Sequence, residues 1–169
     1  MPNKVIKKFP KWGPEFKIEI DLKLNPTSAG GIFNIFRFTN TENDIDGKGD
    51  RIPALFYDDD NEILSFFTQI NDDYSFAADF EVELDIVYKI VIRQFFDENG
   101  GNVFEILVNE NLILNEINGI PETYENVKLL RDEFYKDESY GAILKMNIFN
   151  GNEKCFKAFT TYEDFENCK

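Results

Sequence analysis

The sequence predicts an all-β protein, folded as a two-sheet antiparallel β-sandwich of the jelly-roll kind. Apolar and polar residues alternate along many short segments, and polar turns separate these segments without any stretch of helical periodicity. The chain is also rich in aromatic residues, with 18 Phe and 7 Tyr against a single Trp, which suits pleated, half-buried strands. About a dozen strands at short spacing indicate one domain over residues 1–169.

The clearest strand, residues 16–24, alternates five apolar residues with four charged ones, which gives one buried and one solvent-facing side. Residues 32–39 are apolar on both sides except at Asn34 and Arg37, as expected for a central strand. Further strands are expected over residues 52–57, 63–70, 76–84, 86–96, 103–108, 112–117, 126–130, 142–149 and 154–162. Polar loops are expected at residues 40–50 and 131–140, and Asp-Glu-Asn-Gly-Gly at residues 97–101 predicts a hairpin turn.

The charge of the chain narrows the choice of partners. Its 32 acidic and 18 basic residues give a formal net charge of -14. A negative field repels phosphate backbones and anionic membranes, so we expect no nucleic-acid partner. No stretch reaches the ~20 apolar residues of a membrane span, so we expect no membrane insertion. Divalent cations and neutral or cationic ligands are compatible with this charge.

Histidine is absent from the chain, which excludes Ser-His-Asp and Cys-His catalysis and zinc bound by histidine. Any catalysis would therefore have to use carboxylates. Cys155 and Cys168 are the only cysteines. They could close a short disulfide loop in an oxidising compartment, and two free thiols in a reduced cell are the alternative.

The first residues, Met-Pro-Asn-Lys-Val-Ile-Lys-Lys, are basic but lack the apolar core of a signal peptide. We expect an extracellular or secreted protein in its mature form, with a cytosolic location as the alternative.

The succession of strands resembles the concanavalin A-like lectin/glucanase superfamily, in its laminin G-like branch. Three segments carry the resemblance: Phe16-Lys-Ile-Glu-Ile-Asp-Leu-Lys-Leu-Asn-Pro, Gly49-Asp-Arg-Ile-Pro-Ala-Leu-Phe, and Val103-Phe-Glu-Ile-Leu-Val-Asn-Glu-Asn. It covers residues 15–150 and leaves residues 151–169 as a C-terminal strand and tail. The roles it implies are glycan binding, calcium-assisted adhesion and, in the glucanases, β-glucan hydrolysis. Galectins share the architecture, but their glycan sites rely on His and Trp.

The resemblance to glucanases implies a catalytic strand reading Glu-X-Asp-X-X-Glu. Residues Glu83, Leu84 and Asp85 begin in this way, but Tyr88 stands where the second Glu is needed. Retaining hydrolysis needs two carboxyl groups about 5 Å apart, and Glu83 and Asp85 are expected on one face of a strand without that partner. The sequence therefore predicts no catalytic residue, and β-glucan hydrolysis remains a third hypothesis.

Residues 44–50, Asp-Ile-Asp-Gly-Lys-Gly-Asp, are a candidate calcium loop. Asp44, Asp46 and Asp50 would supply carboxylates on a chain that turns at two glycines, and calcium prefers such oxygen ligands. Leu55 occupies the twelfth loop position, where an EF-hand carries a bidentate Glu, so the full motif is absent. A solvated acidic loop is the alternative.

Sugar sites combine aromatic rings with planar polar groups, and several such residues fall in or beside predicted loops. Trp12 is one of these aromatics, and aromatics that cap the sandwich edges are the alternative reading. The candidate carbohydrate-binding residues are Arg51, Tyr57, Asn71, Asp72, Tyr74, Tyr135 and Tyr140.

Together these features predict a non-enzymatic recognition module that binds a glycan or an extracellular protein, with calcium as the candidate cofactor. A protein–protein adhesion or structural module is the alternative. The oligomeric state does not follow from the sequence.

Overall fold

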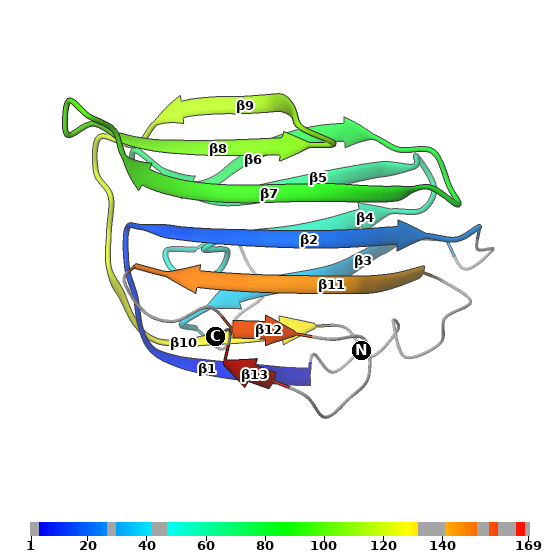
Figure 1. Ribbon diagram of the computed structural model, residues 1–169, viewed down its shortest axis with the longest axis horizontal. Helices are drawn as coiled ribbons and strands as arrows, with labels where there is room; N and C mark the ends of the chain where they lie inside the picture. Colours follow the sequence, from blue (N-terminus) through cyan, green and yellow to red (C-terminus); the bar gives the residue numbers. More distant parts are fainter. Residues whose placement is uncertain are drawn as a thin grey trace.

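The computed structural model describes residues 4–26, 30–41, 47–131, 141–151, 156–158 and 165–167. These residues form 13 strands and no helix, arranged in two antiparallel sheets that pack face to face as a sandwich (Figure 1). The prediction of an all-β, two-sheet sandwich is confirmed. In the described residues, no helix of the length and hydrophobicity needed to cross a membrane occurs.

The first sheet has six strands. Their order across the sheet is β1 (Lys4–Trp12), β10 (Tyr124–Arg131), β3 (Ile32–Thr39), β4 (Ala54–Asp58), β5 (Ile63–Ile70) and β6 (Asp73–Glu81). The second sheet has seven strands, in the order β13 (Phe165–Asn167), β12 (Phe156–Ala158), β11 (Gly141–Asn150), β2 (Phe16–Leu24), β7 (Val87–Phe96), β8 (Asn102–Val108) and β9 (Asn111–Ile117).

The core lies between the sheets and follows the alternation in the sequence. All five apolar residues of β2 are buried, while its four charged residues are half-buried on the other side. Strand β3 is buried at every position after Ile32, which agrees with its prediction as a central strand. The large buried side chains include Trp12, Tyr57 and Phe104. Removing such rings from water supplies the main stabilisation of the fold.

The antiparallel order brings several connections to one end of the sandwich. Strands β1, β3, β5, β7 and β9 end there, and β2, β4, β6, β8 and β10 begin there. The connections from β1 to β2 and from β9 to β10 can be followed at the left of Figure 1. Segments that are more than 100 residues apart in sequence therefore meet at this end.

Strand β1 was not predicted from the sequence, where residues 1–8 were read only as a basic terminus. It pairs along its length with β10, and Trp12 lies directly opposite Tyr124. As an edge strand rich in lysine it buries only Phe9 and Trp12, so the usual alternation is hidden. Strand β10 begins at Tyr124, two residues before the predicted start.

The prediction that Glu83 and Asp85 share one face of a strand is wrong. Strand β6 ends at Glu81, and residues 82–86 turn the chain into β7. Asp85 adopts a φ of 62°, which no strand allows, and its backbone N–H donates to the Leu24 carbonyl at 2.8 Å. The Tyr88 hydroxyl accepts a hydrogen bond from the Glu83 backbone N–H at 2.7 Å and so holds the turn.

Candidate functional site

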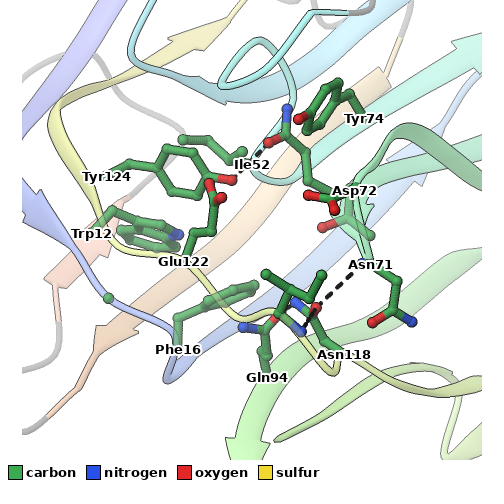
Figure 2. Close-up of a pocket in the computed structure, with 14 residues that line it drawn as sticks. Trp12, Phe16, Ile52, Asn71, Asp72, Tyr74, Gln94, Asn118, Glu122 and Tyr124 are labelled. Atoms are coloured by element: carbon green, nitrogen blue, oxygen red, sulfur yellow. Dashed lines mark hydrogen bonds between the residues drawn. The ribbon is translucent and has the colours of Figure 1, made fainter.

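A cleft that is open to solvent lies at the end of the sandwich where these connections meet (Figure 2). Residues from both sheets line it. They come from the β1–β2 turn, the chain before β4, the end of β5, the β5–β6 turn, the end of β7 and the β9–β10 connection. The lining residues are Trp12, Gly13, Phe16, Ile52, Thr68, Gln69, Asn71, Asp72, Tyr74, Gln94, Asn118, Ile120, Glu122 and Tyr124.

Aromatic rings form the inner wall of the cleft. The Trp12 ring packs against Phe16, with ring centroids 5.1 Å apart, and against Phe38 at 4.4 Å. Trp12 is only 1% exposed, and its indole Nε1 has no hydrogen-bond partner among the described residues. Figure 2 shows this nitrogen on the side of the ring that faces the other lining residues. A buried donor without a partner costs free energy, so an oxygen that reached it would be bound favourably.

The β5–β6 turn that forms one rim is a two-residue turn at Asn71 and Asp72. Both residues have positive φ, 52° and 64°, and Ile70 pairs with Asp73 across the turn. Asn and Asp tolerate this left-handed conformation better than other non-glycine residues. The turn therefore places the exposed Asp72 carboxylate and the half-buried Tyr74 ring in the lining of the cleft.

Two asparagines hold this turn against the β9–β10 connection. The Asn71 side chain donates to the Ile117 carbonyl at 2.8 Å and accepts from the Gly119 N–H at 2.6 Å. The side-chain oxygen of Asn118, which is 3% exposed, accepts from the backbone N–H groups of Asn71 at 3.3 Å and Ile120 at 3.2 Å. These hydrogen bonds join the two sheets and hold the β5–β6 turn at the rim of the cleft.

Further amide groups lie beneath the rim. Asn118 donates through its side-chain nitrogen to Gln94 Oε1 at 3.3 Å. Gln94 Nε2 in turn donates to the Pro14 carbonyl at 2.9 Å, and Asn102 donates to the same carbonyl at 3.2 Å. The side-chain amides of Gln94 and Asn118 are therefore bonded to groups of the protein itself, whereas the Asn102 side-chain oxygen has no partner among the described residues.

On the opposite side, the Tyr124 hydroxyl donates to Gln69 Oε1 at 2.6 Å, and Gln69 Nε2 donates to the Gly47 carbonyl at 3.0 Å. Burial, together with the nearby Glu122 carboxylate, raises the pKa of Tyr124 above its ordinary value. The tyrosine is therefore neutral and acts as a donor.

Lys48 and Glu122 form an ion pair at this side of the cleft, with Nζ and Oε1 2.5 Å apart. The hydrogen bond to Glu122 raises the pKa of Lys48, and the negative Asp72 acts in the same direction. The positive charge of Lys48 is thus already paired with a carboxylate of the lining.

The structure brings three of the predicted carbohydrate-binding residues together, because Asn71, Asp72 and Tyr74 line the cleft. Two others lie elsewhere. The Arg51 guanidinium stacks on Phe67, 4.4 Å from the ring centroid, and on Phe56 at 5.3 Å. Tyr57 is 1% exposed and packs in the core. Tyr135 and Tyr140 lie outside the described residues.

Of the predicted calcium ligands, only Asp50 lies within the described residues; Asp44 and Asp46 lie outside them. The Asp50 side chain is 2% exposed. One carboxylate oxygen accepts from the Gly47 N–H at 2.7 Å, and the other accepts from the Thr41 hydroxyl. Asp50 thus closes the turn at residues 47–50. The described residues contain no cluster of three or more His, Cys, Asp or Glu side chains arranged to hold a metal. Cys155 and Cys168 lie outside the described residues, and their pairing stays a prediction.

The sequence does not predict most of the residues that line the cleft. Phe16 was assigned to a strand, and Gln69, Gln94, Asn118, Glu122 and Tyr124 were not singled out. Tyr124 carried a usable signal, since it is an aromatic residue next to a predicted loop, the criterion that selected Tyr74. The amide residues carried no such signal, because their role depends on contacts between segments distant in sequence.

No protein-family model matches the chain, and no curated protein matches its sequence. Solved structures do resemble the fold. Sheep galectin-11 in complex with glycerol has a TM-score of 0.52 at 12% identity, over 88% of this chain and 99% of that one. The receptor-binding domain of botulinum neurotoxin D has a TM-score of 0.50 at 10% identity, over 95% of this chain and 36% of that one. A third similar structure is the Emp47p carbohydrate recognition domain, with a TM-score of 0.48 at 14% identity, over 88% of this chain and 75% of that one.

The galectin and the neurotoxin domain share the architecture of this chain, a two-sheet β-sandwich. At such low identity the similarities concern the architecture alone. They do not single out the laminin G-like branch to which the sequence was compared.

Proposed function

We propose that this protein is a non-enzymatic module that binds carbohydrate in the cleft at the end of the sandwich. One observation carries the proposal: the cleft combines aromatic rings, carboxylates and a buried indole N–H that has no partner among the described residues. The fold shared with sheep galectin-11 supports it at the level of architecture.

The chemistry of the cleft suits a sugar. A sugar ring presents C–H groups that pack on aromatic faces, and hydroxyl groups that bond to planar polar groups. Tyr74 and Tyr124 supply rings, while Asp72 and Glu122 supply carboxylate oxygens that accept from hydroxyls.

The absence of catalysis is part of the proposal. Glu83 and Asp85, the carboxylates considered for hydrolysis, lie in the turn from β6 to β7, at the other end of the sandwich from the cleft. Asp85 is also paired there with Lys23, at 3.2 Å. A secreted location and calcium-assisted binding remain predictions, and protein–protein adhesion remains the second hypothesis.

The test uses a property of the chain itself, since Trp12 is its only tryptophan and lies in the cleft. A glycan array first selects an oligosaccharide, which is then titrated into the protein while the Trp12 emission is recorded. We expect saturable binding with a change in emission. Tyr74→Ala should weaken binding about tenfold or more, because it removes a stacking surface, whereas Tyr74→Phe should retain most of the affinity.

The matched control is Phe96→Ala. Phe96 is 44% exposed, lies at the end of β7 and does not line the cleft, so its removal should leave the affinity unchanged. Failure of every glycan to bind would overturn the proposed function and favour the protein–protein hypothesis. Binding that Tyr74→Ala leaves unchanged would place the glycan outside the cleft.

A further inference from the structure

We propose that the cleft accepts neutral and 2-amino oligosaccharides and rejects uronate ones. This inference rests on the proposed function and names the class of sugar that the same site takes. Three features of the lining carry it: its charges, the position of the neighbouring lysine, and the hydrogen-bonding groups that the protein leaves open to a ligand.

The charges of the lining are all negative. Among its 14 residues are two carboxylates, Asp72 and Glu122, and no Lys, Arg or His. Asp72 is exposed at the rim, so its charge faces any incoming ligand. A uronate group would bring a like charge next to it, in a protein whose formal net charge is already -14.

The neighbouring cation does not offset this repulsion. Lys48 is bound to Glu122 at 2.5 Å, and that hydrogen bond raises its pKa. Lys48 keeps N–H donors free beside Glu122, but a uronate that reached them would lie next to the Glu122 carboxylate, which already neutralises the charge of the lysine.

The open hydrogen-bonding groups point to hydroxyl ligands. In the described part of the chain, the amides of Asn71, Gln94 and Asn118 are bonded within the protein, whereas the Asp72 carboxylate has no hydrogen-bond partner. An ionised carboxylate only accepts, so it needs O–H or N–H donors, which neutral and 2-amino sugars carry. The Trp12 Nε1 atom adds a single donor for a sugar oxygen. Because this nitrogen is shielded from water, a side chain of the cleft must shift before the oxygen reaches it.

The experiment compares matched tetrasaccharides that differ in the one group that carries the charge, an amine in place of the 2-hydroxyl or a carboxylate in place of the hydroxymethyl group. Gluco-, galacto- and manno-configured tetramers are each used in neutral, 2-amino and uronate form, and dissociation constants are measured by calorimetry at low and high salt. At low salt the uronate should bind about tenfold more weakly than its neutral counterpart, and the 2-amino form at least as tightly. The difference should narrow towards 1 M salt, where the Debye length falls to about 3 Å.

Asp72→Asn tests the origin of the discrimination. Asn suits the positive φ of this turn, so the variant should fold normally. It should reduce the preference for the neutral over the uronate tetramer several-fold. Glu116→Gln removes an exposed carboxylate of β9 that does not line the cleft, and should leave the preference unchanged.

Trp12→Phe keeps an aromatic ring and removes the N–H donor. Its affinity for the neutral tetramer should fall about tenfold while its thermal melting still shows a folded protein. A uronate tetramer that binds as tightly as its neutral counterpart overturns the inference but leaves carbohydrate binding intact. If no tetramer of any series binds, the proposed function and this inference both fail.

Discussion

Single asparagine residues determine the shape of the cleft. Asn71 and Asn118 connect the β5–β6 turn to the chain after β9, and Asn118 makes its contacts while 3% exposed. A buried amide that bonds to two backbone N–H groups and to Gln94 leaves all three partners unsatisfied when it is removed.

We therefore expect Asn118→Ala to lower the free energy of unfolding by about 1–3 kcal/mol, measured by urea denaturation. Asn99→Ala, at an exposed position of the β7–β8 turn, serves as the control and should change it by less than about 0.5 kcal/mol. Equal effects of the two substitutions would show that the Asn118 contacts do not hold the rim.

Tyr124 makes stability depend on pH in the alkaline range. Burial raises its pKa in the folded protein above the ordinary value of 10.0, so the unfolded chain loses the phenol proton first. Above about pH 10 the unfolded state binds fewer protons than the folded state, and stability falls as the pH rises. Tyr124→Phe should make this fall shallower in urea denaturation on both sides of pH 10. An unchanged slope would contradict the role of burial.

Calcium binding at residues 44–50 remains a prediction that can be tested directly. A ligand that binds only the folded state stabilises it, so millimolar calcium should raise the melting temperature relative to chelator. Asp46→Ala should abolish the rise. Asp50 already accepts two hydrogen bonds within the protein, so Asp50→Ala should lower the melting temperature with or without calcium. A melting temperature that calcium leaves unchanged would identify the segment as a solvated acidic loop.

At the scale of strands, the sequence predicts most elements. It fails for an edge strand, β1, and for the turn that ends β6. Strands β2, β3, β5, β8 and β9 lie within one residue of their predicted bounds. In β2 and β5 one buried face imposes a period of two, whereas β3 and β8 are mostly apolar segments buried on both faces. Strand β1 was not predicted because only Phe9 and Trp12 are buried and its exposed positions mix lysines with Val5 and Pro10. The end of β6 was misplaced because the sequence of residues 82–86 continues the alternation, whereas a positive φ at Asp85 and the Tyr88 hydroxyl turn the chain.

The importance of β1 can be measured through its buried side chains. Phe9 is 2% exposed and packs against Trp12 and Phe38, with ring centroids 5.3 and 5.7 Å apart. Phe9→Ala should cost about 3–5 kcal/mol of stability, as expected for a large buried ring. Val5→Ala, 42% exposed on the same strand, should cost less than about 1 kcal/mol. Comparable losses in denaturant unfolding would mean that β1 adds little to the core.

At the scale of the whole molecule, the cleft could not be predicted because its parts are distant in sequence. Trp12 meets Tyr124 through strand pairing, and Gln69 meets Tyr124 through a hydrogen bond across 55 positions. These contacts arise from the order of the strands in the two sheets. The alternation of apolar and polar residues along the sequence does not specify that order. Asn71, Asp72 and Tyr74 were identified because one local turn carries all three.

The central claim is that a glycan binds at this end of the sandwich, and amide NMR shift mapping tests it most directly. A neutral oligosaccharide selected on the array is titrated into isotope-labelled protein. The account predicts shifts concentrated at Gly13, at residues 69–74 and at residues 118–124, which line or flank the cleft. Shifts concentrated instead at Arg51, Phe56 and Phe67, which stack together outside the cleft, would contradict it.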